Sequence, residues 1–328
     1  MRTATDLTSQ IVERCELGSA GASGNFLERV TLRDGRRLVL KRVSPEWDWL
    51  SRTTGDAGRI AWMWDHRLFD RMPASIDHAT VAVETDGAAW SVFMTDVSGA
   101  LVREGQRLTA AEVKRVLAAT AELHHAFWGE SFPELCGYED RYSMLSLRAA
   151  AREKSLGNDL VGDGVPWYWE AFSENVPRDV ADAILLLVDR PALLGEQLAQ
   201  CAQTLIHGDV RLTNLGLSRD RVVLVDWGDR AGTAPPAVEL ASFLAFDGQQ
   251  LDMPREEVIA EFRNLYGDRF EERALQLALI GGLVQLGANF GMRLVTDPDD
   301  GPRRALVLDD LAWWVRTVDT ALETWSPV

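Results

Sequence analysis

The N-terminal part of the chain alternates apolar and polar residues with a period of two, which is the pattern of half-buried β-strands. Asp34-Gly35 is a turn sequence between two such runs, and the second run ends at Lys41. The predicted strands are residues 26–32, 38–40 and 90–94, and a helix is predicted over residues 58–72. We therefore expect residues 1–97 to form a small antiparallel sheet lobe with one helix and a connector at its end.

The pattern in the rest of the chain is mainly that of amphipathic helices, with a period of 3.6. Thr109 and Glu112 form a capping-box pattern at the start of one of them. Residues 132–177 contain glycine and proline breaks and are predicted to be irregular. The predicted helices are residues 109–128, 179–203, 254–266, 275–290 and 303–325. Residues 98–328 are thus expected to form a larger, mainly helical lobe, and the fold class is α+β.

Length and composition are those of a two-lobed globular protein rather than of a membrane protein. The chain has 328 residues, of which 46% are hydrophobic and 26% charged. Gln285 and Asn289 interrupt its most apolar run, and its first residues lack the apolar core of a signal peptide. The three cysteines are widely spaced and odd in number, which favours free thiols over disulfides or zinc. We expect a cytoplasmic protein without membrane contact, either a monomer or a homodimer.

The net charge of −16 disfavours a nucleic-acid partner, because such a partner requires a basic surface. It is compatible with electrostatic attraction of a cationic small molecule. An acidic surface also serves solubility, so charge leaves the nature of the ligand open.

Two short segments carry the residues of a phosphoryl-transfer site. Asp209 and Asn214 lie on one loop, separated by four residues, and an apolar run at 222–225 then ends at Asp226. Transfer of a phosphoryl group from ATP requires a carboxylate that accepts the hydroxyl proton and oxygen ligands that hold Mg²⁺ against the phosphates. The strand-like runs 204–206 and 222–225 flank these residues, which makes a chance match of both segments improbable.

The same segments carry a family resemblance. His207-Gly208-Asp209 stands where protein kinases carry His-Arg-Asp, and Asp226-Trp227-Gly228 stands where they carry Asp-Phe-Gly. The Gly and Trp variants are those of the aminoglycoside phosphotransferase and choline kinase-like family, which this chain resembles. The resemblance implies a bilobal, protein-kinase-like fold. It also implies that Asp209 is the catalytic base, that His207 braces the loop, and that Asn214 and Asp226 bind Mg²⁺. Arg211 would either contact the phosphoryl group or pair with an acid.

The resemblance extends to a nucleotide site in the N-terminal lobe. The glycine-rich residues 17–25 resemble the loop that covers the phosphates of ATP or another NTP, and Lys41 matches the lysine that pairs with the α- and β-phosphates. Met94 matches the bulky residue at the back of the adenine pocket, and residues 95–97 match the connector whose main chain holds adenine. The predicted nucleotide contacts are Gly21, Ser23, Gly24, Lys41, Met94, Thr95 and Val97.

Two positions depart from the family pattern. The helix at 58–72 lacks the glutamate that pairs with the lysine, and Asp56 and Asp65 are its nearest acids. Asp56 is alternatively a helix cap. Glu239-Leu240-Ala241 replaces the family's Asp-Leu-Ala, whose aspartate braces the catalytic loop, so a longer side chain stands at that position. The partner of Lys41 therefore stays open at this point.

The acceptor would bind against the insertion at about residues 128–180, where Trp167, Tyr168 and Trp169 are candidates for stacking on it. Local core packing is the alternative for this aromatic cluster. We predict an O-phosphotransferase that acts on a hydroxyl of a small molecule, with an antibiotic of aminoglycoside or nucleoside type as the first candidate. A metabolic kinase for choline, a sugar or an amino alcohol is the alternative, as is a catalytically weak nucleotide-binding scaffold. A protein kinase is disfavoured, because the stretch from Asp226 to Glu239 is too short for a peptide platform.

Overall fold

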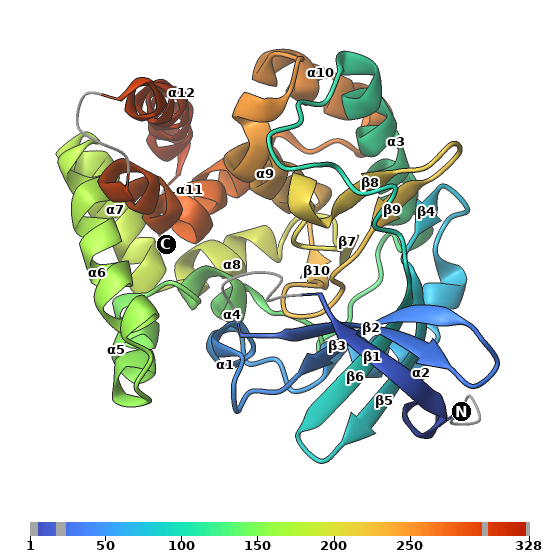
Figure 1. Ribbon diagram of the computed structural model, residues 1–328. Helices are drawn as coiled ribbons and strands as arrows, with labels where there is room; N and C mark the ends of the chain where they lie inside the picture. The colour runs from blue at the N-terminus through green and yellow to red at the C-terminus, as the bar shows by residue number, and fades with distance from the viewer. Residues whose placement is uncertain (1–5, 18–23, 297–300, 326–328) are drawn as a thin grey trace.

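The computed structural model describes residues 6–17, 24–296 and 301–325, which form two lobes (Figure 1). The smaller lobe contains a five-stranded sheet of order β1-β2-β3-β6-β5, in which all neighbours are antiparallel. Its strands are β1 Ile11–Glu16, β2 Phe26–Leu32, β3 Arg37–Val43, β5 Thr80–Asp86 and β6 Ala89–Thr95. The larger lobe is mainly helical, so the predicted bilobal α+β fold is confirmed.

The two faces of the sheet have different roles because side chains alternate along a strand. In β3, Leu38 and Leu40 are buried in a small apolar core of the lobe, together with Val30 and Phe93. Lys41 lies one residue further and therefore projects from the opposite face, which is turned toward the larger lobe. The sequence alternation thus places a cation between the lobes.

The helix predicted at 58–72 is shorter in the structure. Helix α2 covers Arg59–Asp65, and the chain continues as a 3₁₀ turn, η2 Leu68–Arg71. Arg67 has a φ of +60°, a left-handed conformation that ends the α-helix. The other short elements of this lobe are η1 Thr8–Gln10, α1 Trp49–Thr53 and β4 Ile76–Asp77.

The larger lobe is built around helix α11, Glu272–Thr296, which packs against α6, α9 and α12. The predicted capping box of Thr109 and Glu112 begins α3. The helices are α3 Ala110–Ala126, α4 Tyr138–Ser143, α5 Leu147–Ser155, α6 Asp159–Glu174, α7 Arg178–Asp189, α8 Ala192–Leu198, α9 Pro236–Asp247, α10 Arg255–Tyr266 and α12 Pro302–Thr324, with 3₁₀ turns η4 Gly248–Gln250 and η5 Gly267–Arg269.

The expectation that residues 132–177 are irregular is wrong, because α4, α5 and α6 lie there. Helix α6 continues through Pro166. Val161, Val165, Trp169 and Phe172 are buried at helical spacing, and their packing outweighs the cost of about 3 kcal/mol that a proline imposes on a helix interior. The helix predicted at 179–203 is instead two helices, and the second, α8, begins just after Pro191.

Three short strand pairs carry the two motifs. Strand β7 (Thr204–Ile206) pairs with β10 (Gly232–Ala234), and β8 (Leu215–Leu217) pairs with β9 (Val222–Leu224). The 3₁₀ turn η3, Leu212–Asn214, leads into β8. Strand β4 from the N-terminal part of the chain adds to β9 in parallel, which joins the two lobes at the hairpin.

Helix α11 is the one helix in the described residues that is long and apolar enough to cross a membrane. Its apolar window is 83% buried inside the fold. The composition of α11 is therefore explained by its place at the centre of the helical lobe.

Candidate active site

The catalytic-loop residues and the loop after β9 lie side by side. The Val225 N–H donates to the carbonyl oxygen of Asn214 at 3.0 Å, and Nε2 of His207 lies 3.0 Å from the carbonyl oxygen of Val225. His207 Nδ1 also accepts the N–H of Asp209 at 3.2 Å. His207 therefore joins the two motifs through hydrogen bonds, as a bracing residue would.

Glu239 holds the same loop from α9. Its carboxylate accepts the N–H groups of His207 at 2.8 Å and of Gly208 at 2.6 Å. Its Oε2 also lies 3.2 Å from Nε2 of buried His124. Burial raises the pKa of Glu239, but the hydrogen bond and charge of His124 outweigh it, and the net shift is downward. The glutamate in place of aspartate thus still contacts the loop directly.

Gly208 has no room for a side chain. Its φ of +78° is left-handed, and a Cβ would overlap the carbonyl oxygen of Arg230 and approach Nη2 of Arg141 to 2.7 Å. The Arg141 guanidinium is buried there and donates to the carbonyl oxygens of both Gly208 and Arg230. The loop after β9 is therefore packed directly onto the catalytic loop.

Asp209 is buried and both of its carboxylate oxygens are engaged. Asn214 Nδ2 donates to Oδ2 at 2.8 Å, and Arg230 Nη1 donates to Oδ1 at 2.6 Å. Arg211 Nε lies 3.5 Å from Oδ2, so Arg211 pairs with the acid in this structure. Arg230 was not found by the sequence analysis. In the sequence, Arg230 is recognisable only by its position four residues after Asp226. The sequence does not show that its side chain reaches Asp209.

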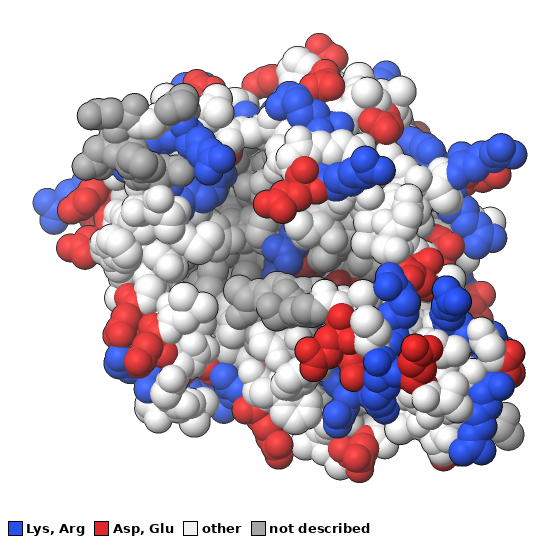
Figure 2. All heavy atoms as spheres, viewed as in Figure 1, with Lys and Arg blue, Asp and Glu red and all other residues white. Residues whose placement is uncertain are grey.

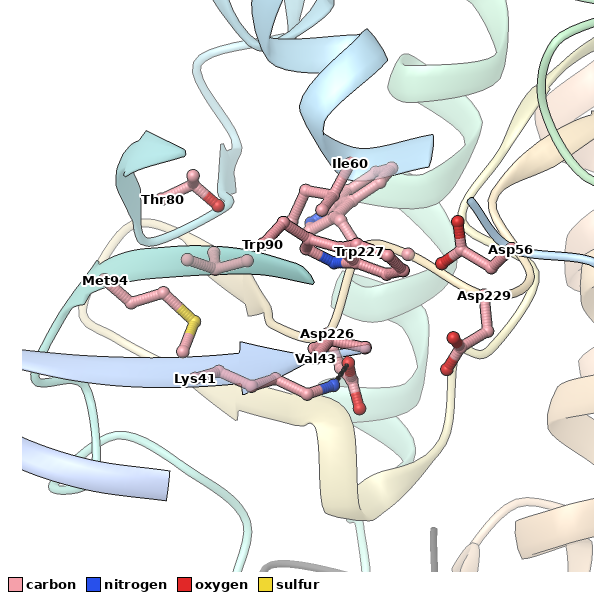
Figure 3. Close-up of a pocket in the computed structure, with 12 residues that line it drawn as sticks. Lys41, Val43, Asp56, Ile60, Thr80, Trp90, Met94, Asp226, Trp227 and Asp229 are labelled. Carbon is pink, nitrogen blue, oxygen red and sulfur yellow. Dashed lines mark hydrogen bonds and ion pairs between the residues drawn. The ribbon is translucent and has the colours of Figure 1, made fainter. Parts of the chain in front are cut away.

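Lys41 forms an ion pair with Asp226 across the lobes (Figure 3). Burial would lower the pKa of Lys41, but the carboxylates of Asp226 and Asp229 raise it above its usual value. Burial would raise the pKa of Asp226, but Lys41 brings it down to about 2. Asp56, one of the candidate partners of Lys41, instead accepts the N–H groups of Gly58 and Arg59. Asp56 therefore binds the start of α2 from two residues before its N-cap, which is Gly58.

The backbone at Asp226 is strained, with a φ of +68°. This turn directs the indole of Trp227 into the core, where it is buried and donates to the carbonyl oxygen of Leu224 at 2.7 Å. The indole lies edge-on to His207, with ring centroids 4.4 Å apart. Trp227 therefore anchors the neighbouring residue Asp226, which is the proposed metal ligand.

A cavity of about 550 Å³ lies between the sheet and the catalytic loop. Its lining from the smaller lobe includes the predicted nucleotide contacts Lys41, Met94, Thr95 and Val97. Its lining from the larger lobe includes Arg211, Asn214 and Asp226. Figure 2 shows a hollow near the middle of this face, with basic and acidic atoms side by side at its lower end.

The glycine-rich loop is only partly described. Gly21 and Ser23 lie outside the described residues. Gly24 has a φ of +96°, and a Cβ there would approach the carbonyl oxygen of Trp47 to 2.6 Å. Packing on Trp47 therefore accounts for this glycine, whereas Asn25 and Leu17 line the cavity.

A second, smaller cavity of about 20 Å³ lies behind Lys41 (Figure 3). It has room for about one water molecule. Asp229, a residue that the sequence analysis missed, lines it and accepts the hydroxyl of Ser51 at 3.1 Å. Burial and the carboxylates of Asp56 and Asp226 raise the pKa of Asp229 to about 8, although Lys41 opposes the shift. Asp229 therefore holds its proton more tightly than an ordinary aspartate does.

The aromatic cluster of α6 does not form a three-residue platform. Trp169 is only 2% exposed, and its Nε1 donates to the carbonyl oxygen of Leu145 at 2.7 Å. Trp167 is 54% exposed, and Tyr168 stacks on it with ring centroids 6.2 Å apart. Successive residues of a helix point about 100° apart, so one of the three must face the core.

Known proteins resemble this chain in sequence family and in fold. The family model described as "Phosphotransferase enzyme family" matches residues 17–276. No curated protein matches the chain.

Solved structures match over nearly the whole length. A thermostable mutant of aminoglycoside phosphotransferase APH(4)-Ia, in a complex with ADP and hygromycin B, is 14% identical, with 94% of each chain covered and a TM-score of 0.51. Amicoumacin kinase hAmiN, in complex with AMP-PNP, Ca²⁺ and Ami, is 14% identical, with 96% of this chain and 89% of its own covered and a TM-score of 0.53. Choline kinase LicA from Streptococcus pneumoniae is 11% identical, with 94% and 95% covered and a TM-score of 0.52. At these identities the likeness establishes the fold.

Proposed function

We propose that this chain, which belongs to the phosphotransferase enzyme family, transfers a phosphoryl group from ATP or another NTP to a hydroxyl of a small molecule. The model of that family matches residues 17–276. One observation carries this proposal. Asn214 and Asp226 line the 550 Å³ cavity with Lys41, and Asn214 donates directly to the carboxylate of Asp209. The candidate base, Asp209, therefore lies next to the cavity proposed for the nucleotide.

The nucleotide would lie in this cavity, with adenine against the connector after β6. The N–H of Thr95 already donates to the carbonyl oxygen of Ala79 at 2.8 Å, and the carbonyl oxygen of Val97 accepts the N–H of Ala100 at 2.8 Å. The N–H of Val97 is therefore the candidate for a hydrogen bond to adenine. Met94 would line the back of the adenine pocket, and Lys41 would contact the phosphates. Complexes of the similar structures with ADP and AMP-PNP support this assignment.

Asn214 and Asp226 fit Mg²⁺ as oxygen ligands. The Nδ2 of Asn214 donates to both the main-chain oxygen and Oδ2 of Asp209, which leaves Oδ1 of Asn214 for a metal. One amide and one carboxylate oxygen match the way in which Mg²⁺ binds, since its other ligands are phosphates and water. The described residues contain no group of three or more His, Cys, Asp or Glu side chains able to hold a metal, so a nucleotide-free metal site is not expected. When bound, Mg²⁺ would neutralise charge on the phosphates.

Asp209 would orient the acceptor hydroxyl and accept its proton. The acceptor oxygen then forms a bond to the γ-phosphorus, the bond from that phosphorus to the bridging oxygen breaks, and ADP leaves. The side chain of Arg211 is 32% exposed and lines the cavity, so it can move from Asp209 to the transferring group. His207 would hold the loop in place.

The first candidate acceptor is a hydroxyl-bearing antibiotic, which the hygromycin B and amicoumacin kinase structures support. A metabolic alcohol is the second, supported by the choline kinase. Lys41, Asp209, Asn214 and Asp226 are all present, which argues against a scaffold without activity. The cysteines are free in the structure, which is compatible with a cytoplasmic setting.

The test is ATP consumption with Mg²⁺ against aminoglycosides, nucleoside antibiotics, choline and sugars, with wild type and Asp209→Ala in parallel. We expect Asp209→Ala to abolish transfer while ATP still raises the melting temperature, because Asp209 contacts the acceptor and not ATP. If Asp209→Ala keeps most of the wild-type turnover, Asp209 is not the base. A wild-type protein that binds ATP and phosphorylates none of the panel would favour the scaffold.

A further inference from the structure

The candidate base is held by a buried arginine that belongs to neither motif. Arg230 lies between Asp226-Trp227-Gly228 and β10, and its side chain is 7% exposed. We propose that Arg230 is a positioning residue for phosphoryl transfer, which holds the carboxylate of Asp209 in the orientation that accepts the proton of the acceptor. This inference rests on the proposed function.

The carboxylate of Asp209 is fixed by donors on both oxygens. Arg230 Nη1 binds Oδ1 at 2.6 Å, and Asn214 Nδ2 binds Oδ2 at 2.8 Å. Each carboxylate oxygen can accept two hydrogen bonds, so the pair of donors leaves acceptor capacity for a hydroxyl. The torsion of an aspartate carboxylate is otherwise broad, and a carboxylate held on one side only would rotate. Removing Arg230 should therefore disorder the base without removing it.

Arg230 is itself fixed by its surroundings. Its carbonyl oxygen accepts Nη2 of Arg141, and its guanidinium lies over the ring of Phe246 on α9, 5.6 Å from the centroid. Nη1 is the one side-chain nitrogen of Arg230 with a hydrogen-bond partner in the described residues, and that partner is Asp209. Within the described part of the chain, the one hydrogen bond that this guanidinium donates is thus directed to the base.

Arg211 differs from Arg230 in position. Arg211 lies over the same ring, 5.1 Å from its centroid, but its side chain is partly exposed and lines the nucleotide cavity. Arg230 is absent from that lining. The two arginines therefore have different roles in this proposal. Arg211 would contact the phosphates, and Arg230 would hold the base. Arg230 exchanges no proton and forms no bond in the transfer.

Buried ion pairs contribute little net stability, because desolvation offsets their attraction. A second buried pair in the same lobe offers a matched control. Arg255 pairs with Asp310, lies 4.9 Å from the ring centroid of Trp313, and like Arg230 has a buried Nε without a hydrogen-bond partner. In the described part of the chain no hydrogen bond or ion pair joins Arg255 to Asp209, so a variant at this position reports the structural cost of losing such an arginine.

The experiment compares Arg230→Met, Arg230→Lys and Arg255→Met with wild type. Turnover is measured as Mg·ATP hydrolysis, with water as the acceptor, and as transfer to any acceptor that the panel identifies. Binding is measured as the thermal shift caused by AMP-PNP. We expect Arg230→Met to lose turnover on the order of 10²-fold, the cost of misplacing a catalytic group, with the KM for ATP and the AMP-PNP shift nearly unchanged. Arg230→Lys should recover part of the loss, and Arg255→Met should keep wild-type turnover.

A double-mutant cycle separates positioning from folding. If Arg230 acts through Asp209, Arg230→Met should add no further loss to Asp209→Asn. The inference is overturned if Arg230→Met loses no more turnover than Arg255→Met, or if its effect is additive with Asp209→Asn. Should Arg230→Met fail to fold, the same comparisons are made with Arg230→Lys. A wild-type protein without turnover would instead contradict the proposed function.

Discussion

At the scale of single residues, the charged side chains at the lobe junction are paired with opposite charges. Lys41 is paired with Asp226 and Asp209 with Arg230, so each group proposed for transfer has an opposite charge beside it. Burying these charges unpaired would be costly.

Asp226 is the residue at which a substitution should test metal binding separately from the chemistry of the acceptor. In Asp226→Ala we expect Mg²⁺-dependent thermal stabilisation by ATP to vanish, since a metal ligand is removed, whereas wild type should gain about 2.7 kcal/mol at a hundredfold excess over Kd. Asp220→Ala, which removes an exposed acid from the hairpin between β8 and β9, is the control and should behave as wild type. Unchanged stabilisation in Asp226→Ala would remove Asp226 from the metal site.

The candidate site residues that the sequence can indicate are those whose pattern depends on neighbours in the chain. Asp209 and Asn214 share one loop, and the Gly-Asp order follows from the positive φ at Gly208. Arg230 and Asp229 were missed because their partners, Asp209 and Ser51, are distant in sequence. Local pattern carries no information about such pairs, and the partner of Lys41 stayed open for the same reason.

At the scale of elements, α9 supports the catalytic loop at two points. Glu239 near its start accepts N–H groups of His207 and Gly208, and Asp247 at its end accepts the N–H of Leu212 at 2.8 Å. Burial raises the pKa of Asp247 to about 7, although Leu212 and Arg211 oppose the shift. The end of α9 therefore holds a carboxyl group that keeps its proton up to nearly neutral pH.

Asp247 should make stability depend on pH between its unfolded and folded pKa values. Above about pH 4 the unfolded chain releases the proton that the folded state keeps, so this contribution to the free energy of unfolding is lost as pH rises toward about 7. Asp247→Asn keeps an acceptor for Leu212 and removes the titration. Urea unfolding is measured at several pH values. The free energy of unfolding of wild type, relative to that of Asp247→Asn, should fall by up to about 1.4 kcal/mol for each unit by which pH rises in this range. Parallel curves for the two proteins would show that Asp247 does not titrate in this range.

The elements themselves were predictable where one periodicity dominated. The strands at 26–32 and 90–94 and the helices α10 and α12 lie where the sequence placed them. Helices α4 to α6 were missed because Gly and Pro were given more weight than the apolar spacing from Val161 to Phe172. That spacing was visible in the sequence, whereas the packing on α11 that stabilises a helix through Pro166 was not.

On the scale of the whole molecule, the chain carries a net charge of −16. On the face that Figure 2 shows, basic and acidic groups are interleaved around the hollow. Next to Asp209 stand two guanidinium groups, Arg211 and Arg230. The local environment of the base therefore gives little electrostatic attraction to a polycation.

We accordingly expect kcat/KM for the true acceptor to change by less than about threefold between low and high salt, because screening affects mainly exposed, long-range charge pairs. Glu170 and Glu174 are the exposed acids of α6 that follow Trp167 in the chain. Replacing both with glutamine should leave the salt profile unchanged, whereas Trp167→Ala should raise KM if the exposed indole stacks on the acceptor. A steep fall of kcat/KM with salt, flattened by the two glutamine substitutions, would contradict this prediction. It would indicate that the acidic face of α6 captures a polycationic acceptor such as an aminoglycoside.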